Sequence, residues 1–149
     1  ALDWAELPLA AVPPPEQLKE MAAGPNWVKY NALRLIEALD KGEPLPAKYK
    51  APFAVWQFGD DLTLIGMPGE TVGGYVPLLR DVLGPRKLWI AGYTNDCFGY
   101  LPTVDVLEEV GYETRGLIPE IGFFAPEAQD LAVDAVRRLA KQAGRPLPE

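Results

Sequence analysis

The stretch AVWQFGDDLTLIGMPGE, residues 54–70, decides the fold. Residues 54–58 and 62–67 are rich in β-branched and aromatic side chains, as β-strands are. The Gly-Asp-Asp sequence between them is typical of a tight turn, and a Pro-Gly-Glu sequence ends the second segment. The stretch therefore predicts a β-hairpin at the centre of a small sheet.

Helical patterns surround this hairpin. Before it, we expect a short helix that starts at Pro15, and a longer one that Asn26 caps and Gly42 ends. After it, we expect helices at residues 75–83, after Thr103 and after Pro126, with a short buried strand, KLWIAGY, at residues 87–93. The predicted fold class is α/β (α+β), a small mixed sheet with a β-hairpin packed against several helices.

Two features of this prediction concern side chains. Apolar residues recur at helical spacing, so we expect them to face the core. Periodic elements also carry Trp27, Trp56 and Trp89, which are predicted to be core residues. The inward positions are Val28, Ala32, Leu35, Ile36 and Leu39 in the longer early helix, and Ala128, Ala132, Ala135, Val136 and Leu139 in the last one.

The ends of the chain differ from its middle. Residues 1–14 are proline-rich with little periodicity and are predicted to be a linker, and residues 146–149 a frayed tail. Residues 15–145 would then form a single α/β domain. The chain begins at Ala1, and we expect it to be the C-terminal part of a longer protein.

Composition excludes several classes of function. The formal net charge is -7 and the pI is about 4.7, which argues against a nucleic-acid partner. A single cysteine, Cys97, rules out an internal disulfide and has no histidine to activate it. The chain contains no histidine, the commonest metal ligand and proton shuttle, so few catalytic mechanisms remain open to it alone.

Two polar loops follow predicted strands, where α/β proteins usually build their sites. In the first, Glu70 comes directly after the Pro-Gly turn, and it could simply be an acidic residue at a helix N-terminus. The second, AGYTNDCFGYLPT at residues 91–103, could be a turn whose tyrosines pack on the core.

Taken together and in order, these segments resemble the neutral/alkaline (non-lysosomal) ceramidase family, in the C-terminal part of its catalytic region. The matching residues are PGE at 68–70, GYTNDCFGYLPT at 92–103 and YE at 112–113. The resemblance covers roughly residues 50–125. It implies a zinc-dependent amide hydrolase that acts on N-acyl amides of the ceramide, or sphingolipid, type and is usually exported or periplasmic.

The resemblance also implies roles for particular residues. In the family, two histidines, a glutamate and a tyrosine hold one zinc ion, and Glu70 and Tyr100 correspond to the last two. Tyr112 corresponds to the catalytic tyrosine that stabilises the oxyanion, and Asn95 would shape the loop that aims Tyr100. Zinc-bound water would be the nucleophile while the metal polarises the amide carbonyl.

The absence of histidine departs from this pattern, since both histidine ligands lie in the family's N-terminal region. The expected partners are therefore the N-terminal part of the same enzyme and a lipid-like N-acyl amide substrate. We expect zinc in the full-length protein, whereas this chain alone is expected to be metal-free and inactive, because two ligands define no zinc geometry.

Two alternatives remain open at this stage. The chain could be a non-catalytic binding or structural domain that retains the family fold. It could also belong to a metal-independent hydrolase with Glu70 and Asp96 as an acid/base pair, which would require two carboxylates of separated pKa in one cleft.

Overall fold

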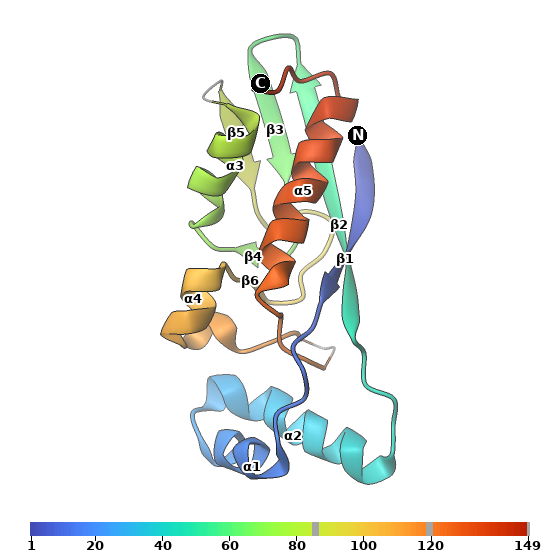
Figure 1. Cartoon of the computed structure of the whole chain (residues 1–149), viewed down its shortest axis with the longest axis vertical. Helices are drawn as coiled ribbons and strands as arrows, with labels where there is room; N and C mark the ends of the chain where they lie inside the picture. Colours follow the sequence, from blue (N-terminus) through green and yellow to red (C-terminus); the bar gives the residue numbers. More distant parts are fainter. Residues whose placement is uncertain (85–86, 119–120, 149) are drawn as a thin grey trace.

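The predicted hairpin lies at the centre of a four-stranded mixed sheet with the strand order β1-β2-β3-β5 (Figure 1). The computed structural model describes residues 1–84, 87–118 and 121–148 of the chain. Strands β1, β2 and β3 are antiparallel neighbours, and β5 pairs parallel to β3. The strands of this sheet are β1 Leu2–Pro8, β2 Lys48–Phe58, β3 Leu62–Gly66 and β5 Leu88–Ala91.

A second, two-stranded sheet and several helices complete the α+β fold and confirm the predicted fold class. The small sheet pairs β4, Glu70–Thr71, in parallel with β6, Tyr100–Leu101. The helices are α1 Pro15–Ala23, α2 Asn26–Lys41, α3 Tyr75–Leu83, α4 Val104–Glu109 and α5 Glu127–Gln142, with a 3₁₀ turn at Tyr112–Thr114. Among the described residues, no helix combines the length and apolarity needed to cross a bilayer.

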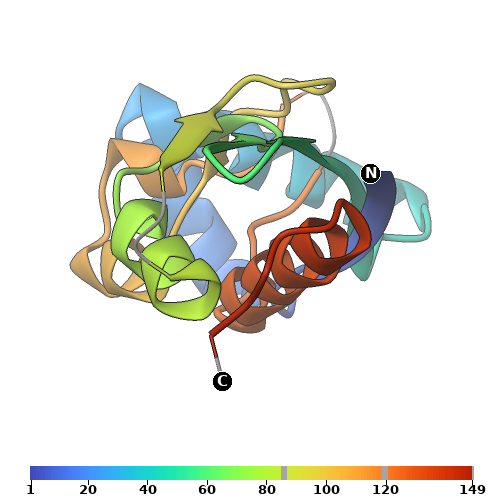
Figure 2. The ribbon, with the colours of Figure 1, turned by 90° about the horizontal axis from the view of Figure 1, so that it is seen from above.

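Helices α3 and α5 lie on one face of the four-stranded sheet, as Figure 2 shows from above. The predicted inward face of α5 is confirmed, because all five of its apolar positions are buried. They pack with Phe53, Val55 and Ile65 of the sheet and with Tyr75 and Leu79 of α3. This interface is the main hydrophobic core.

The opposite face of the sheet carries exposed aromatic side chains. Trp56 pairs with Leu64, and Leu64 pairs with Trp89, so these three residues form one row across the strands. Trp56 is 41% exposed and Trp89 is 63% exposed, so the prediction that both are core residues is wrong. Side chains alternate across a strand, and these two point away from the layer of α3 and α5. Trp4 lies on the same face and is also exposed.

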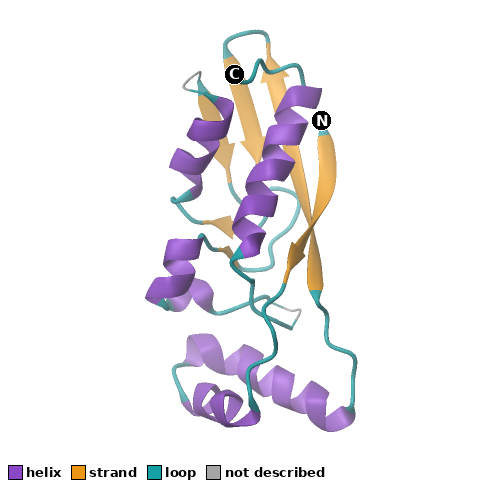
Figure 3. Ribbon diagram, viewed as in Figure 1, coloured by secondary structure: helices purple, strands orange, loops and turns teal. Residues whose placement is uncertain are grey.

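Helices α1 and α2 form a separate layer at one end of the molecule (Figure 3). Leu18, Ala32 and Leu35 make a second, smaller core there. Gly42 ends α2 with a φ of 65°, as predicted. Two predictions about α2 are wrong: Leu39 is exposed, and Asn26 is the first helical residue and makes no capping hydrogen bond.

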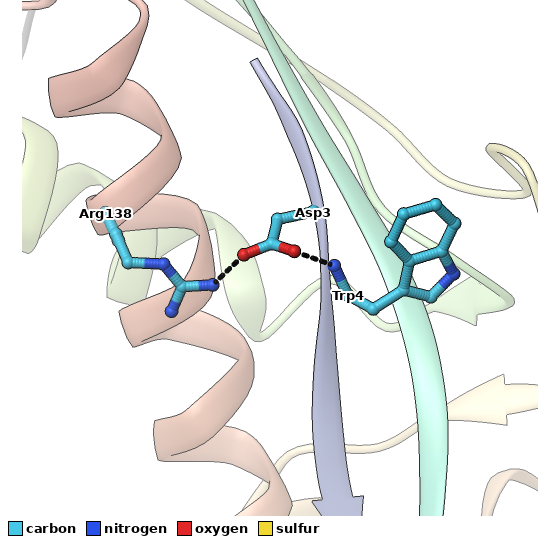
Figure 4. A network of polar contacts seen from close by, with 3 residues as sticks. All are labelled: Asp3, Trp4 and Arg138. Carbon is cyan, nitrogen blue, oxygen red and sulfur yellow. Dashed lines mark hydrogen bonds and ion pairs between the residues drawn. The ribbon is translucent and has the colours of Figure 1, made fainter.

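The predicted linker at residues 1–14 is instead largely a β-strand. Residues 2–8 pair with β2 along their full length, so β2 supplies the order that local sequence does not. An exposed ion pair ties this strand to α5: an Arg138 nitrogen lies 3.0 Å from an Asp3 carboxylate oxygen (Figure 4). The other Asp3 oxygen accepts a 2.8 Å hydrogen bond from the backbone amide of Trp4. The indole side chain of Trp4 points away from α5 (Figure 4).

The C-terminal segment is also more ordered than predicted. Arg145 is 3% exposed and donates to the Leu83 carbonyl oxygen at 3.0 and 2.9 Å and to the Thr63 hydroxyl. Leu147, inside the predicted tail, packs against the main core, while Glu149 lies outside the described residues. The guanidinium satisfies carbonyl groups at the end of α3, and this anchors the segment.

Candidate functional site

The small β4–β6 sheet places Glu70 directly beside Tyr100. The Glu70 amide donates a 2.7 Å bond to the Gly99 carbonyl. Gly69 makes this approach possible, since a Cβ there would lie 2.6 Å from the Gly99 carbonyl oxygen, and its φ of 62° also favours glycine. Two residues that sequence analysis named as ligands therefore occupy opposite positions of one ladder.

The loop between β5 and β6 is fastened to the segment that ends β3. The Tyr93 amide donates to the Gly69 carbonyl at 2.7 Å, and the Thr94 amide donates to the Met67 carbonyl at 3.0 Å. Asn95 adopts a φ of 67°, a left-handed conformation that asparagine tolerates better than most residues. This backbone geometry favours the loop-shaping role predicted for Asn95.

Tyr93 is a site residue that sequence analysis did not single out. Its hydroxyl hydrogen-bonds to the Glu70 carboxylate, and this bond raises the pKa of Tyr93 to about 12. Tyr93 has a φ of 55°, which is uncommon outside glycine. The polar residues at 93–96 indicated a functional loop. Nothing in that sequence shows which of its side chains contacts Glu70.

Tyr100 also hydrogen-bonds to Glu70. Desolvation, followed by this bond, raises the pKa of Tyr100 above its ordinary value. Both phenols therefore keep their protons at neutral pH and share one carboxylate. Ionisation of Tyr100 at neutral pH would require a positive charge close to its oxygen, such as a metal cation bound there.

Tyr112 packs against this cluster from the 3₁₀ turn. Its ring centroid lies 5.8 Å from that of Tyr100, with the two rings at 80°. The Tyr112 hydroxyl oxygen accepts a 2.6 Å bond from Arg115. The structure thus places Tyr112 beside Tyr100, which in turn pairs with Glu70.

Asp96, the second carboxylate of the alternative acid/base pair, is engaged elsewhere. One of its oxygens accepts a 2.7 Å bond from the Tyr49 hydroxyl, and the other accepts a 2.8 Å bond from the Cys97 amide. These contacts fix the loop to β2. The Cys97 side chain itself is exposed.

A pocket of about 600 Å³ opens beside Glu70 and Tyr100. Its lining includes Glu70, Glu109 and Glu113, so three acidic residues border it. Such a lining suits a neutral or cationic group better than an anion. The remaining lining residues are Thr71, Val72, Gly73, Val106, Val110 and Gly111.

The donor set fits half of a zinc site. Among residues 1–84, 87–118 and 121–148, no three His, Cys, Asp or Glu side chains are grouped so as to hold a metal ion. Glu70 and Tyr100 nevertheless offer two side-chain oxygens from opposite positions of one ladder, and a hydrogen bond to Glu70 contributes to the raised pKa of Tyr100. Ligands in a tetrahedral site with bonds of about 2.0 Å lie roughly 3.3 Å apart, so these two oxygens could share one ion.

Comparisons of the chain with protein-family models, with curated proteins and with solved structures found no match.

Proposed function

We propose that this chain is the C-terminal part of a zinc-dependent amide hydrolase similar to the neutral/alkaline ceramidases. The observation that carries the proposal is the pairing of Glu70 with Tyr100 on adjacent strands, with the Tyr112 ring against Tyr100. Segments far apart in sequence supply these three side chains. Their convergence is expected for a site and is not required by a turn or a helix cap.

The residues of this chain would divide the work as follows. Glu70 and Tyr100 supply two of the four zinc ligands, and a zinc ion held there would polarise the amide carbonyl and activate a water molecule. Tyr93 keeps the Glu70 carboxylate in place by donating to it. Tyr112 donates its hydroxyl hydrogen to the oxygen that becomes negative during amide hydrolysis.

We propose that the substrate is a lipid-like N-acyl amide whose polar end is neutral or cationic. The pocket beside Glu70 carries Glu109 and Glu113, which would repel a phosphate or carboxylate group. A hydroxylated or amine-bearing group would find hydrogen-bond acceptors there.

The N-terminal part of the same enzyme is the partner that this proposal requires. It would supply the missing ligands, and the open face of the sheet lies next to the site. A Cβ on Gly66 of this face would lie 2.6 Å from Thr94, in the loop that carries Tyr93, and 3.1 Å from the Trp56 ring. One partner could therefore cover the exposed tryptophans and reach Glu70 together.

The test is an assay of the longer protein that contains this chain. We expect one zinc ion per chain and hydrolysis of an N-acyl amide. E70Q should abolish both, whereas E43Q, which changes an exposed glutamate after α2, should preserve both. A longer protein that hydrolyses the amide without bound zinc, or an E70Q variant with full activity, would overturn the proposal.

A second candidate, a non-catalytic binding domain, is favoured by the exposed aromatic face. Trp4, Trp56 and Trp89 all expose indole side chains on this face, and exposed aromatic residues gathered on one face favour an interaction site. A partner bound with unchanged affinity by the E70Q variant, in a protein without amidase activity, would support this alternative.

A further inference from the structure

Arg115 lies against both tyrosines of the site. Its guanidinium carbon is 4.8 Å from the centre of the Tyr112 ring and 5.3 Å from that of the Tyr100 ring. One of its nitrogens donates to the Tyr112 hydroxyl oxygen at 2.6 Å. A single planar cation therefore contacts the proposed ligand phenol and the proposed oxyanion donor.

The backbone at Arg115 is held from α2. Asn31 is fully buried, and its side-chain nitrogen donates to the carbonyl oxygens of Arg115 and Leu117, each at 2.9 Å. Its side-chain oxygen accepts a 3.1 Å bond from the Gly122 amide. Gly116 packs so closely on this side chain that a Cβ would lie 2.8 Å from the Asn31 nitrogen. Asn31 thus fixes the segment from which Arg115 extends.

We infer that Arg115 is a positioning residue that orients the Tyr112 hydroxyl for the oxyanion, an inference that rests on the proposed function. The Tyr112 oxygen accepts from Arg115, so its own hydrogen points elsewhere and is available to a substrate oxygen. The guanidinium also stacks on the ring, which restricts rotation of the Tyr112 side chain. Its positive charge polarises the phenol and strengthens the bond that Tyr112 donates.

The geometry makes Arg115 act through Tyr112 and not on the substrate directly. One of its nitrogens donates to the Tyr112 oxygen, and its guanidinium carbon lies over the Tyr100 and Tyr112 rings. Loss of Arg115 should therefore reduce turnover more than substrate binding.

The experiment is a double-mutant cycle on the longer protein, with kcat and KM measured for R115M, Y112F and the double variant. Removal of one oxyanion donor costs about 100- to 1,000-fold in kcat, and we expect Y112F to fall in this range. R115M should lower kcat about 10- to 100-fold with little change in KM, because misplaced groups cost rates of this order. In the Y112F background, R115M should cost less than about threefold.

A matched control exists on α2. Arg34 donates to the Tyr30 hydroxyl at 3.2 Å and lies 5.9 Å from that ring, so it repeats the arginine–tyrosine arrangement away from the site. R34M should leave kcat unchanged. R115K, which retains the charge but not the planar fork, should give a kcat between those of the parent protein and R115M.

A measurement on this chain separates the inference from the proposed function. Ring ¹³C NMR should show contacts between Tyr112 and Tyr100 in the unmodified chain and in R34M, and their loss in R115M. If Tyr112 keeps its position in R115M, or if the losses in kcat from R115M and Y112F multiply, the inference is wrong. If the longer protein hydrolyses no amide, the proposed function fails, while the NMR result still decides whether Arg115 positions Tyr112.

Discussion

Glu70 organises the site because two phenols donate to one carboxylate. Tyr93 reaches it from the loop after β5, and Tyr100 reaches it from the paired strand. Ligand carboxylates in metal sites are usually held by hydrogen bonds of this kind. The arrangement therefore orders Glu70 before any metal arrives.

Replacement of Glu70 should change the titration of Tyr93. In E70Q, we expect the pKa of Tyr93 to fall from about 12 toward its ordinary value of 10, because the bond to the carboxylate is the largest cause of the increase. Residue-specific ¹³C NMR of the tyrosine rings measures this directly. It also separates Tyr93 from Tyr75, whose pKa burial raises independently.

The raised pKa of Tyr93 also makes the free energy of unfolding depend on pH. The folded state holds the Tyr93 proton more tightly than the unfolded state does, so this contribution is fully present below pH 10 and is lost as pH rises from 10 to about 12. E70Q should reduce this alkaline loss. An unchanged Tyr93 titration in E70Q would show that the two side chains do not interact.

Sequence reasoning reached part of the site. The resemblance to the ceramidase family predicted that Glu70 and Tyr100 converge, because both correspond to ligands of one zinc ion. It missed Tyr93 and Arg115, because their roles depend on a left-handed backbone and on a segment fixed by a distant helix. Neither property leaves a periodic signal in the sequence.

At the scale of elements, α2 supports the site through one buried side chain, the carboxamide of Asn31. The sequence pattern of α2 identified its apolar residues Ala32 and Leu35, yet Asn31 beside them is equally buried. It makes three hydrogen bonds to the segment at 115–122. Two carbonyls and one amide would lose their partners without it.

We predict that N31A lowers the free energy of unfolding by on the order of 3 kcal/mol, since buried polar groups left without partners are costly. N26A should cost less than about 0.5 kcal/mol, because the exposed Asn26 makes no capping bond and exposed substitutions have small effects. Urea unfolding of both variants is the measurement. Equal losses would show that Asn31 is not the link between α2 and this segment.

The C-terminal segment gives a second prediction. R145M should lower the free energy of unfolding by about 2 kcal/mol, because it leaves the Leu83 carbonyl and the Thr63 hydroxyl without their buried donor. R137M, on the exposed face of α5, should change stability by less than about 0.5 kcal/mol. Thermal unfolding followed by circular dichroism compares the two, and an R145M variant as stable as R137M would contradict the anchoring role.

The elements themselves were largely predictable. The hairpin, α1, α2, α3 and α5 follow from local periodicity and from Pro and Gly positions. The first strand and the C-terminal anchor do not, because β1 is specified by its pairing with β2 and Arg145 by carbonyls at the end of α3. Local sequence carries little information on such long-range partners.

At the scale of the whole molecule, the sheet is covered on one face and open on the other. The sequence pattern correctly predicted that Trp56 and Trp89 lie in β-strands. It could not show which face of the sheet the helices cover. The tryptophans of the open face contribute little to the stability of this chain, since much of their surface remains in water.

We therefore predict that substitutions on the two faces of the sheet differ in their effect on the free energy of unfolding. W89K should change the free energy of unfolding by less than about 1 kcal/mol, whereas F53A on the covered face should cost about 3–5 kcal/mol. W89K should also weaken binding to the separately produced N-terminal part, as measured by analytical ultracentrifugation. If W89K destabilises the chain as much as F53A, the open face is part of the core and not a docking surface.

We propose that the oxygens of Glu70 and Tyr100 share one metal ion in the longer protein. The most direct measurement is an anomalous difference map, recorded at the zinc absorption edge, from crystals of the longer protein. We expect one peak within about 2.2 Å of both oxygens. A zinc peak away from Glu70 and Tyr100, or a fully active protein with no peak, would contradict it.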